Sequence, residues 1–171
     1  MAIDIGTFKE GAMKSGGFRP TLFSIESSTL DRDFSLLCNA SQVPAMTMGV
    51  IEIPYFGRKI KVAGVRSYTD WQVTIINDED FLVRRTLEAW HAAINSSEGN
   101  IRAIDNYRST AFINQYGKAG GEAIRSYTME NCWPIQISPI DLAWDNGDAI
   151  EEFTVTWAFD YWNVADTDVR T

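Results

Sequence analysis

Apolar and polar residues alternate along much of this chain, and the alternation predicts many short strands. Residues 151–161 show it best, because every second residue from Phe153 to Tyr161 is large and apolar. Alternation with a period of two is typical of a strand with one buried face. Two further apolar runs, 50–53 and 58–62, flank residues 54–57 and predict a long hairpin with a turn of about four residues.

The same reasoning predicts the remaining β-structure. We expect strands at 19–25, 34–38, 71–76, 111–116 and 123–131, followed by a segment from Trp133 to Leu142. Glycines in residues 117–121 favour a turn, and Asn146-Gly147 is a strong two-residue hairpin signal before the last strand. The expected total is about eight strands and one helix.

The helix is predicted at residues 78–94. Its apolar residues recur on one helical face, at Val83, Leu87, Trp90 and Ile94. Asn77 or Asp78 is a suitable N-cap. Asp80, Arg84 and Glu88 have the spacing of weak ion pairs on the opposite, solvent-facing side. We expect this helix to cover the sheet.

Length and composition fit one domain spanning residues 1–171. We expect a flexible glycine-rich arm at 1–17 and a short tail at 163–171. The formal net charge of −8 makes the chain a poor nucleic-acid binder, since phosphate binding needs clustered Lys and Arg. The sequence has no apolar run of membrane-spanning length and no signal-peptide pattern in its first residues, so synthesis in the cytoplasm and no membrane anchor are expected.

No group of residues in the sequence points to catalysis, a metal or a cofactor. His91 is the only histidine and is expected to be a solvated surface residue. Cys38 and Cys132 are expected to be reduced, buried thiols. Five of the six tryptophans fit apolar faces and predict core packing, whereas Trp162 closes the last strand and is a candidate for a subunit interface.

Five stretches of the sequence, taken together, resemble a known family. They are RPTLF at 19–23, RKIKVAG at 58–64, TDWQVTIINDE at 69–79, WP at 133–134 and FDYW at 159–162. In this order and over this span the chain resembles the tail tube family of contractile-tailed bacteriophages. Residues 45–53 and the tail after Trp162 depart from the pattern.

The resemblance implies a mainly β fold with one α-helix, a β-sandwich or split barrel whose strands join those of neighbours in a ring-wide β-barrel. It implies a structural protein, not an enzyme, with no cofactor. Six copies would form each ring, and stacked rings would form the conduit for DNA ejection. The implied partners are further copies of the chain and the tail sheath, baseplate and tape-measure proteins. The implied location is the virion tail, assembled in the host cytoplasm.

Self-assembly needs exposed surfaces, and the predicted hairpin is the best candidate. Its turn is apolar for an exposed segment, and three cations cluster beside it. The candidate assembly residues are Ile51, Ile53, Tyr55, Phe56, Arg58, Lys59, Lys61 and Trp162. Six copies would carry a formal charge of six times −8, or −48, so DNA would pass through such a ring without binding.

Other functions share these features. A baseplate or tube-initiator protein, or a tube subunit of a secretion system or bacteriocin, would carry the same motifs. A monomeric β-barrel module that binds a small ligand through its aromatic residues is the alternative from a different class. A binding module would remain a monomer, whereas a tube protein would form rings or filaments.

Overall fold

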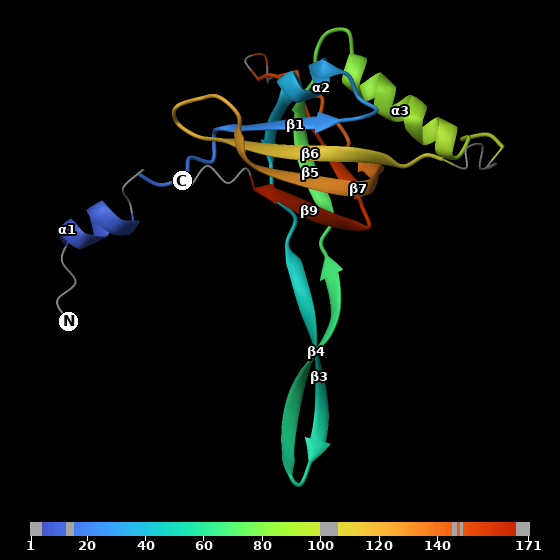
Figure 1. The fold of residues 1–171 in the computed structure, drawn as a ribbon. Helices are drawn as coiled ribbons and strands as arrows, with labels where there is room; N and C mark the ends of the chain where they lie inside the picture. The colour runs from blue at the N-terminus through green and yellow to red at the C-terminus, as the bar shows by residue number, and fades with distance from the viewer. Residues whose placement is uncertain (1–4, 13–15, 100–105, 145–146, 148, 167–171) are drawn as a thin grey trace.

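Two antiparallel sheets that share one long strand form the body of the molecule, and a separate hairpin projects from it (Figure 1). The computed structural model describes residues 5–12, 16–99, 106–144, 147 and 149–166. The strands are β1 (Phe23–Ser27), β2 (Cys38–Ser41), β3 (Met46–Tyr55), β4 (Arg58–Tyr68), β5 (Trp71–Ile76), β6 (Ser109–Tyr116), β7 (Ala123–Ile137), β8 (Glu152–Ala158) and β9 (Tyr161–Asp166). The helices are α1 (Ile5–Thr7), the π-helical turn η1 (Phe8–Ala12), α2 (Arg32–Leu37) and α3 (Leu82–Ile94).

Strand β7 belongs to both sheets. Its first half lies between β6 and β9, and its second half pairs with β8. The chain changes direction at Asn131, whose φ of 57° lies in the left-handed region. The Asn131 amide donates to the Asp160 carboxylate at 2.7 Å and stabilises this bend. One sheet therefore runs β1-β6-β7-β9 and the other β7-β8-β5-β2, which is the mainly β, sandwich-like architecture that the sequence predicts.

The core fills the space between the two sheets and under the helices. Trp157 lies at its centre, with ring centroids 5.8 Å from Trp71, 5.7 Å from Trp90 and 6.2 Å from Phe34. The alternation along β8 buries Phe153, Val155 and Trp157, as the sequence predicts. A cluster of this size, with edge-to-face ring contacts, gives the domain its main hydrophobic stabilisation.

Residues 34–38 do not form the strand that the sequence predicts. Helix α2 covers residues 32–37, and only Cys38 begins a strand. Phe34 is buried and Leu37, three residues later, packs against the core, which places both on one side of the helix. A short apolar run fits either structure, and packing of Phe34 on Trp157 selects the helix here.

Helix α3 carries the predicted apolar stripe but begins later than predicted. Val83, Leu87 and Trp90 are buried, and Ile94 packs against the core. The N-cap position is Phe81, with φ of 53°, and neither Asn77 nor Asp78 occupies it. Asp78 precedes the helix, but its carboxylate accepts a hydrogen bond from the Leu82 N–H at 3.1 Å. This bond satisfies one of the first N–H groups of the helix, which have no carbonyl partner within it.

The C-terminal third also differs from the prediction at two points. The predicted last strand is two strands, because the chain turns at Asp160, whose N–H donates to the Glu130 carbonyl at 3.1 Å, and Tyr161 begins β9. The two segments predicted at 123–131 and 133–142 include one continuous strand, β7. Asn146 lies outside the described residues, and the strands that flank it end at Ile137 and begin at Glu152.

Two predicted surface features have clear outcomes. Residues 117–121 form the predicted turn between β6 and β7, with positive φ at Gly120 and Gly121. Within the described N-terminal residues, 5–12 are helical and stand away from the body (Figure 1), while most of the rest of the predicted arm lies outside the described residues. No helix among the described residues is long and apolar enough to cross a membrane.

Candidate assembly surface

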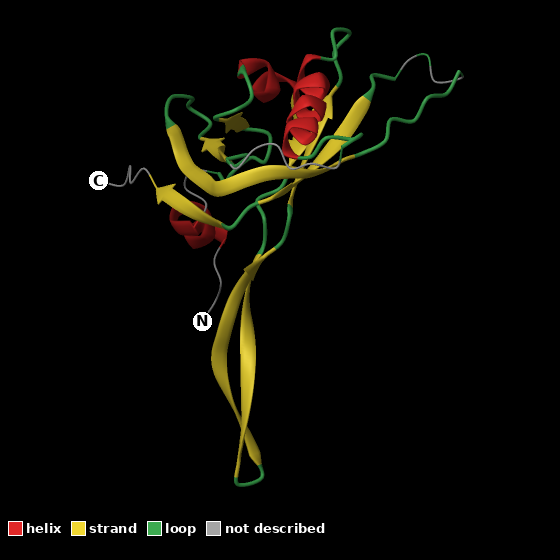
Figure 2. Cartoon of the chain, turned by 90° about the vertical axis from the view of Figure 1, so that its right-hand side faces the viewer, coloured by secondary structure: helices red, strands yellow, loops and turns green. Residues whose placement is uncertain are grey.

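The β3–β4 hairpin projects well beyond the body as a two-stranded ribbon (Figures 1 and 2). It joins the body at its base, where the Thr69 N–H donates to the Ala45 carbonyl at 3.1 Å. Tyr68 there meets Phe159 and Trp162, with ring centroids 5.8 and 6.0 Å apart. The strands run longer than the predicted 50–53 and 58–62. An isolated two-stranded ribbon of this length has little stability of its own in water.

The strand register separates the hairpin into two chemically different faces. Ile51 pairs with Val62 and Ile53 with Ile60, so four branched apolar side chains share one face. On the opposite face Glu52 pairs with Lys61 and Pro54 with Lys59, and Lys59 forms a 2.7 Å ion pair with Glu52. The charged and polar side chains of this face are readily hydrated. The branched side chains of the apolar face are more stable when another surface covers them.

The apolar face is uncovered in the single chain. Ile51, Ile53, Ile60 and Val62 are between 45% and 53% exposed. Other exposed apolar residues of the hairpin are Met46, Met48, Val50, Tyr55 and Val65. Scattered exposed apolar residues are normal, whereas a contiguous set on one ribbon marks an interaction surface.

Two glycines bring the hairpin strands unusually close near its middle. Gly49 and Gly64 face each other across a register shift between Met48 and Val50. A Cβ at Gly64 would lie 3.1 Å from the Gly49 backbone, and a Cβ at Gly49 would lie 3.1 Å from the Val65 carbonyl oxygen. A side chain at either site would push the strands apart. The bulge and the glycines therefore set the twist of the ribbon and the direction of its apolar face.

The turn at the hairpin tip has two central residues, not the four predicted. Phe56 and Gly57 both have positive φ, at 43° and 76°, as a type I′ turn requires. Glycine adopts this conformation readily, but phenylalanine is strained in it, by about 1–2 kcal/mol. Phe56 is also 90% exposed. A residue that is both strained and exposed is a candidate for function rather than for folding.

The eight predicted assembly residues fall into two groups in space. Seven of them lie in the outer half of the hairpin, and these are Ile51, Ile53, Tyr55, Phe56, Arg58, Lys59 and Lys61. Trp162 instead lies at the hairpin base in β9, half-buried between Tyr68 and Tyr127, whose centroid is 5.6 Å from its own. The sequence did not single out Met46, Met48 and Val65, because their polar and glycine neighbours obscure the alternation.

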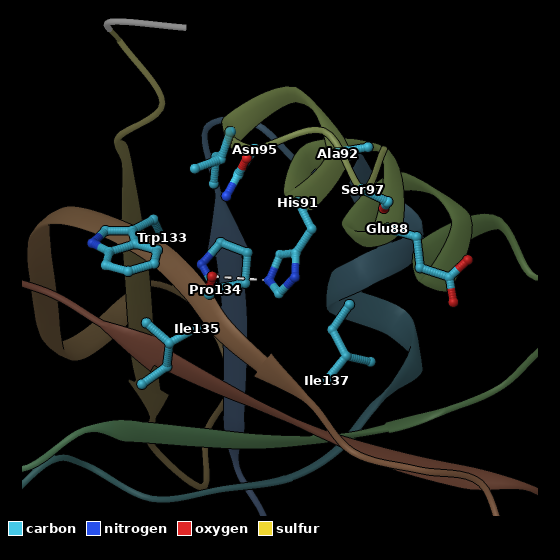
Figure 3. Close-up of a pocket in the computed structure, with 10 residues that line it drawn as sticks. Glu88, His91, Ala92, Asn95, Ser97, Trp133, Pro134, Ile135 and Ile137 are labelled. Carbon is cyan, nitrogen blue, oxygen red and sulfur yellow. Dashed lines mark hydrogen bonds between the residues drawn. The ribbon is translucent and has the colours of Figure 1, made fainter. Parts of the chain in front are cut away.

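A cleft of about 470 Å³ lies between α3 and β7 (Figure 3). The prediction of a solvated His91 is wrong, because its Nε2 donates to the Pro134 carbonyl at 3.0 Å and the residue is half-buried. Pro134 has no N–H, so this contact ties the helix to a strand position that lacks one donor. Apart from Glu88 and His91, the residues that line the cleft have no ionisable side chain, and the His91 ring already makes the hydrogen bond that joins α3 to β7.

The two cysteines are free, as predicted. Cys132 is fully buried and Cys38 half-buried, and neither forms a disulfide. Burial raises the pKa of both thiols from an ordinary value of 9.0 to about 12. A thiol with a pKa in this range stays protonated at neutral pH, where it is a poor nucleophile and a poor metal ligand. No group of three or more potential metal ligands occurs in the part of the chain that the structure describes.

Comparison with known families and curated proteins gives one consistent answer. The family model described as "Phage tail tube protein" matches residues 11–165. Tail tube protein gp19 of Enterobacteria phage T4 is 34% identical over 155 residues, covering 88% of this chain and 94% of that protein. The tail tube protein of Serratia phage KSP90 is 26% identical over 156 residues, covering 84% of this chain and 88% of that protein.

Solved structures share the fold at low sequence identity. The chain is similar to the tube-terminating cap of the anti-feeding prophage, with a TM-score of 0.69, 14% identity and coverage of 88% of this chain and 92% of that one. It is also similar to a chain of the PVC extracellular contractile injection system, in its extended sheath–tube complex. There the TM-score is 0.64 at 14% identity, with 97% of this chain and 100% of that one covered.

Proposed function

Because this chain belongs to the phage tail tube protein family, it is a structural subunit of a tail tube, and we propose that six copies close into a ring and that rings stack into a hollow tube. The tube serves as the conduit for DNA ejection. Its partners are the tail sheath around it, the baseplate at one end and the tape-measure protein inside it. The subunit assembles in the host cytoplasm and becomes part of the virion tail.

The observation that supports assembly most strongly is the bare apolar face of the β3–β4 hairpin. Four branched apolar side chains on a ribbon with no core of its own need a partner to leave water. Full burial of an exposed aliphatic side chain contributes about 1.5–3 kcal/mol. These four are already about half covered, so burial of the rest contributes about half of that for each, summed over the four side chains and over every copy in the ring. All seven outer hairpin residues take part in assembly, with Ile51, Ile53, Tyr55 and Arg58 on the apolar face, Phe56 at the tip, and Lys59 and Lys61 on the polar face. Trp162 supports the base from which the hairpin projects.

Strand edges support ring closure. Among the described strands, β1 pairs only with β6 and β9 only with β7, so each leaves one edge open. An open edge can accept a strand of another copy, and closure into a ring removes all such edges. The four-stranded sheet β1-β6-β7-β9 would then become one segment of a ring-wide β-barrel.

A tube with net negative charge would let DNA pass without binding it. Six copies carry a formal charge of −48, which repels phosphates. Assembled tubes are therefore expected not to bind duplex DNA in a fluorescence-anisotropy titration at low salt. Submicromolar, salt-sensitive binding would contradict the conduit, because it would require several cations free to contact phosphates.

The hairpin assignment is tested by a matched pair of substitutions. Ile53→Asp puts a charge on the apolar face, and Ile124→Asp puts the same charge on an isoleucine of the body with similar exposure, 44% against 48%. Both variants should fold, by circular dichroism. Ile53→Asp should remain as single subunits or isolated rings in sedimentation velocity, while Ile124→Asp reports the general effect of such a charge. Tubes of normal length from Ile53→Asp would reject the assignment.

A further inference from the structure

A second exposed apolar surface lies on the segment between β7 and β8. Its described residues line a groove of about 400 Å³. Leu142, Trp144 and Ile150 are more than 70% exposed there, and Trp144 is fully exposed, against the prediction that it joins the core. Trp is enriched at the centres of protein interfaces, and three large apolar residues around one groove indicate a binding surface.

This groove is also acidic. Asp141, Glu151 and Glu152 line it, and the sequence has no Lys or Arg between residues 126 and 169. Glu151 is held by the Asn77 side chain, and the Glu152 carboxylate accepts from Asn39 at 2.6 Å. A partner for this surface must bring apolar side chains and positive charge together.

The β3–β4 hairpin has that chemistry. Residues 46–68 contain four Lys and Arg and one Glu, a net charge of +3, while the whole chain carries −8. The remaining residues therefore carry −8 minus +3, or −11. Lys59 is paired with Glu52, whereas Arg58 and Lys61 have no ion-pair partner among the described residues. Beside these two cations, Phe56 is the most exposed apolar residue of the hairpin.

The two surfaces lie at opposite ends of the molecule. In Figure 1 the hairpin tip is at the bottom, and the orange-red segment that precedes β8 is at the top. One copy therefore cannot bring its own tip to its own groove. Two complementary surfaces at opposite ends of one chain make a head-to-tail contact, which repeats without closing and builds a filament.

We propose that the groove lined by Leu142, Trp144 and Ile150 receives the hairpin tip of a second copy from the next ring. Phe56 enters against the apolar lining, and Arg58 on the apolar face of the ribbon and Lys61 on its polar face meet Asp141 and Glu152 from the two sides of the tip. The proposal rests on the tube function proposed above and names the acceptor of its hairpin. It also accounts for the strained tip, since Phe56 is placed for contact with another copy. A bare cation is a poor occupant, because it would leave the exposed apolar lining in water.

A charge swap tests the contact. The hairpin variant Arg58→Glu/Lys61→Glu and the groove variant Asp141→Lys/Glu152→Lys should each lose stacking, because like charges then face each other. The chain that carries all four substitutions should regain tubes, since the pair is restored with opposite sign. Glu98→Lys/Glu122→Lys is the control, with the same change of charge as the groove variant at two exposed sites elsewhere. Tube mass is measured by pelleting and negative-stain microscopy.

The outcomes separate this contact from the tube function itself. If the hairpin variant loses tubes while the groove variant keeps them, the hairpin drives assembly but the groove is not its acceptor, and the inference is overturned. If the wild-type chain forms no tubes, both proposals fail. If both single-surface variants fail to stack and the combined chain does not recover, the electrostatic pairing is wrong.

Disulfide trapping gives an independent measurement. Phe56→Cys combined with Leu142→Cys should give a ladder of covalent multimers on oxidation, because the native thiols are protected by burial. Val65→Cys combined with Leu142→Cys is the control, since Val65 is similarly exposed but lies away from the tip. Ladders of equal strength from both pairs, or from neither, would overturn the assignment of Phe56 to the groove.

Discussion

At the scale of single residues, Trp90 joins helix α3 to the rest of the core. Its indole N–H donates to the Tyr107 carbonyl at 3.0 Å, and its ring meets Trp157 edge to face. His91, the next residue, makes one hydrogen bond to Pro134 and lines the cleft between α3 and β7. We therefore expect Trp90 to contribute much more than His91 to the free energy of unfolding.

Trp90→Ala should lower the free energy of unfolding of the dissociated subunit by about 3–5 kcal/mol, as a large-to-small change in a core. His91→Ala should lower it by only about 1 kcal/mol, the net value of one hydrogen bond. Urea denaturation of both variants measures the difference. Equal losses would show that the cleft beside His91 is more than a surface depression.

The two thiols predict a loss of stability at alkaline pH. Their pKa rises from 9.0 in an exposed thiol to about 12 in the folded chain, so only the unfolded chain ionises between these values. The stabilisation is fully present below pH 9 and declines as the pH approaches the folded pKa. Unfolding free energies measured at several pH values above about 9 should fall more steeply for the wild type than for Cys38→Ala/Cys132→Ala. Parallel curves would show that the thiols titrate normally.

Residue type alone does not decide burial in this chain. Trp144 and Trp157 both follow apolar or small residues, yet one is fully exposed and the other buried at the centre of the core. The period-two pattern of β8 identifies Trp157, because its neighbours on the same face are apolar. Trp144 has no such pattern around it, and only the three-dimensional position of its loop shows that nothing in the same chain covers it.

At the scale of elements, the hairpin combines a well-predicted pattern with a poorly predicted tip. Strand β5 and the apolar stripe of α3 could be read from periodicity, and so could the pairing of β3 with β4. The two-residue turn could not, because Phe56 is a poor residue for positive φ and gives no type I′ signal. Helix α2 was missed because six residues are too few to distinguish a helical from a strand period.

Phe56→Asn tests whether the tip is built for folding or for contact. Asn before Gly57 is the preferred type I′ pair, so the change should relieve strain and leave the subunit as stable or more stable. Assembly should weaken, because the exposed aromatic ring is lost. Thermal unfolding of the dissociated subunit and the critical concentration for tubes measure the two effects. Unchanged assembly would assign Phe56 to the turn alone.

At the scale of the whole molecule, charge and shape point in the same direction. The β3–β4 hairpin has a net positive charge, and the rest of the chain has a net negative charge. The hairpin tip and the acidic groove lie at opposite ends of the molecule (Figure 1). The sequence indicated the acidic balance and the assembling family, through motifs scattered from residue 19 to 162. It could not indicate the separation of charge between two ends, since that depends on how far the hairpin projects from the sheets.

Cryo-electron microscopy of the purified full-length chain tests the central claim most directly. We expect hollow tubes of stacked six-membered rings, in which Ile51 and Ile53 are buried against a neighbouring copy. The hairpin tip should reach the next ring. A chain that stays monomeric at high concentration, or tubes in which the apolar face of the hairpin remains in solvent, would contradict the account.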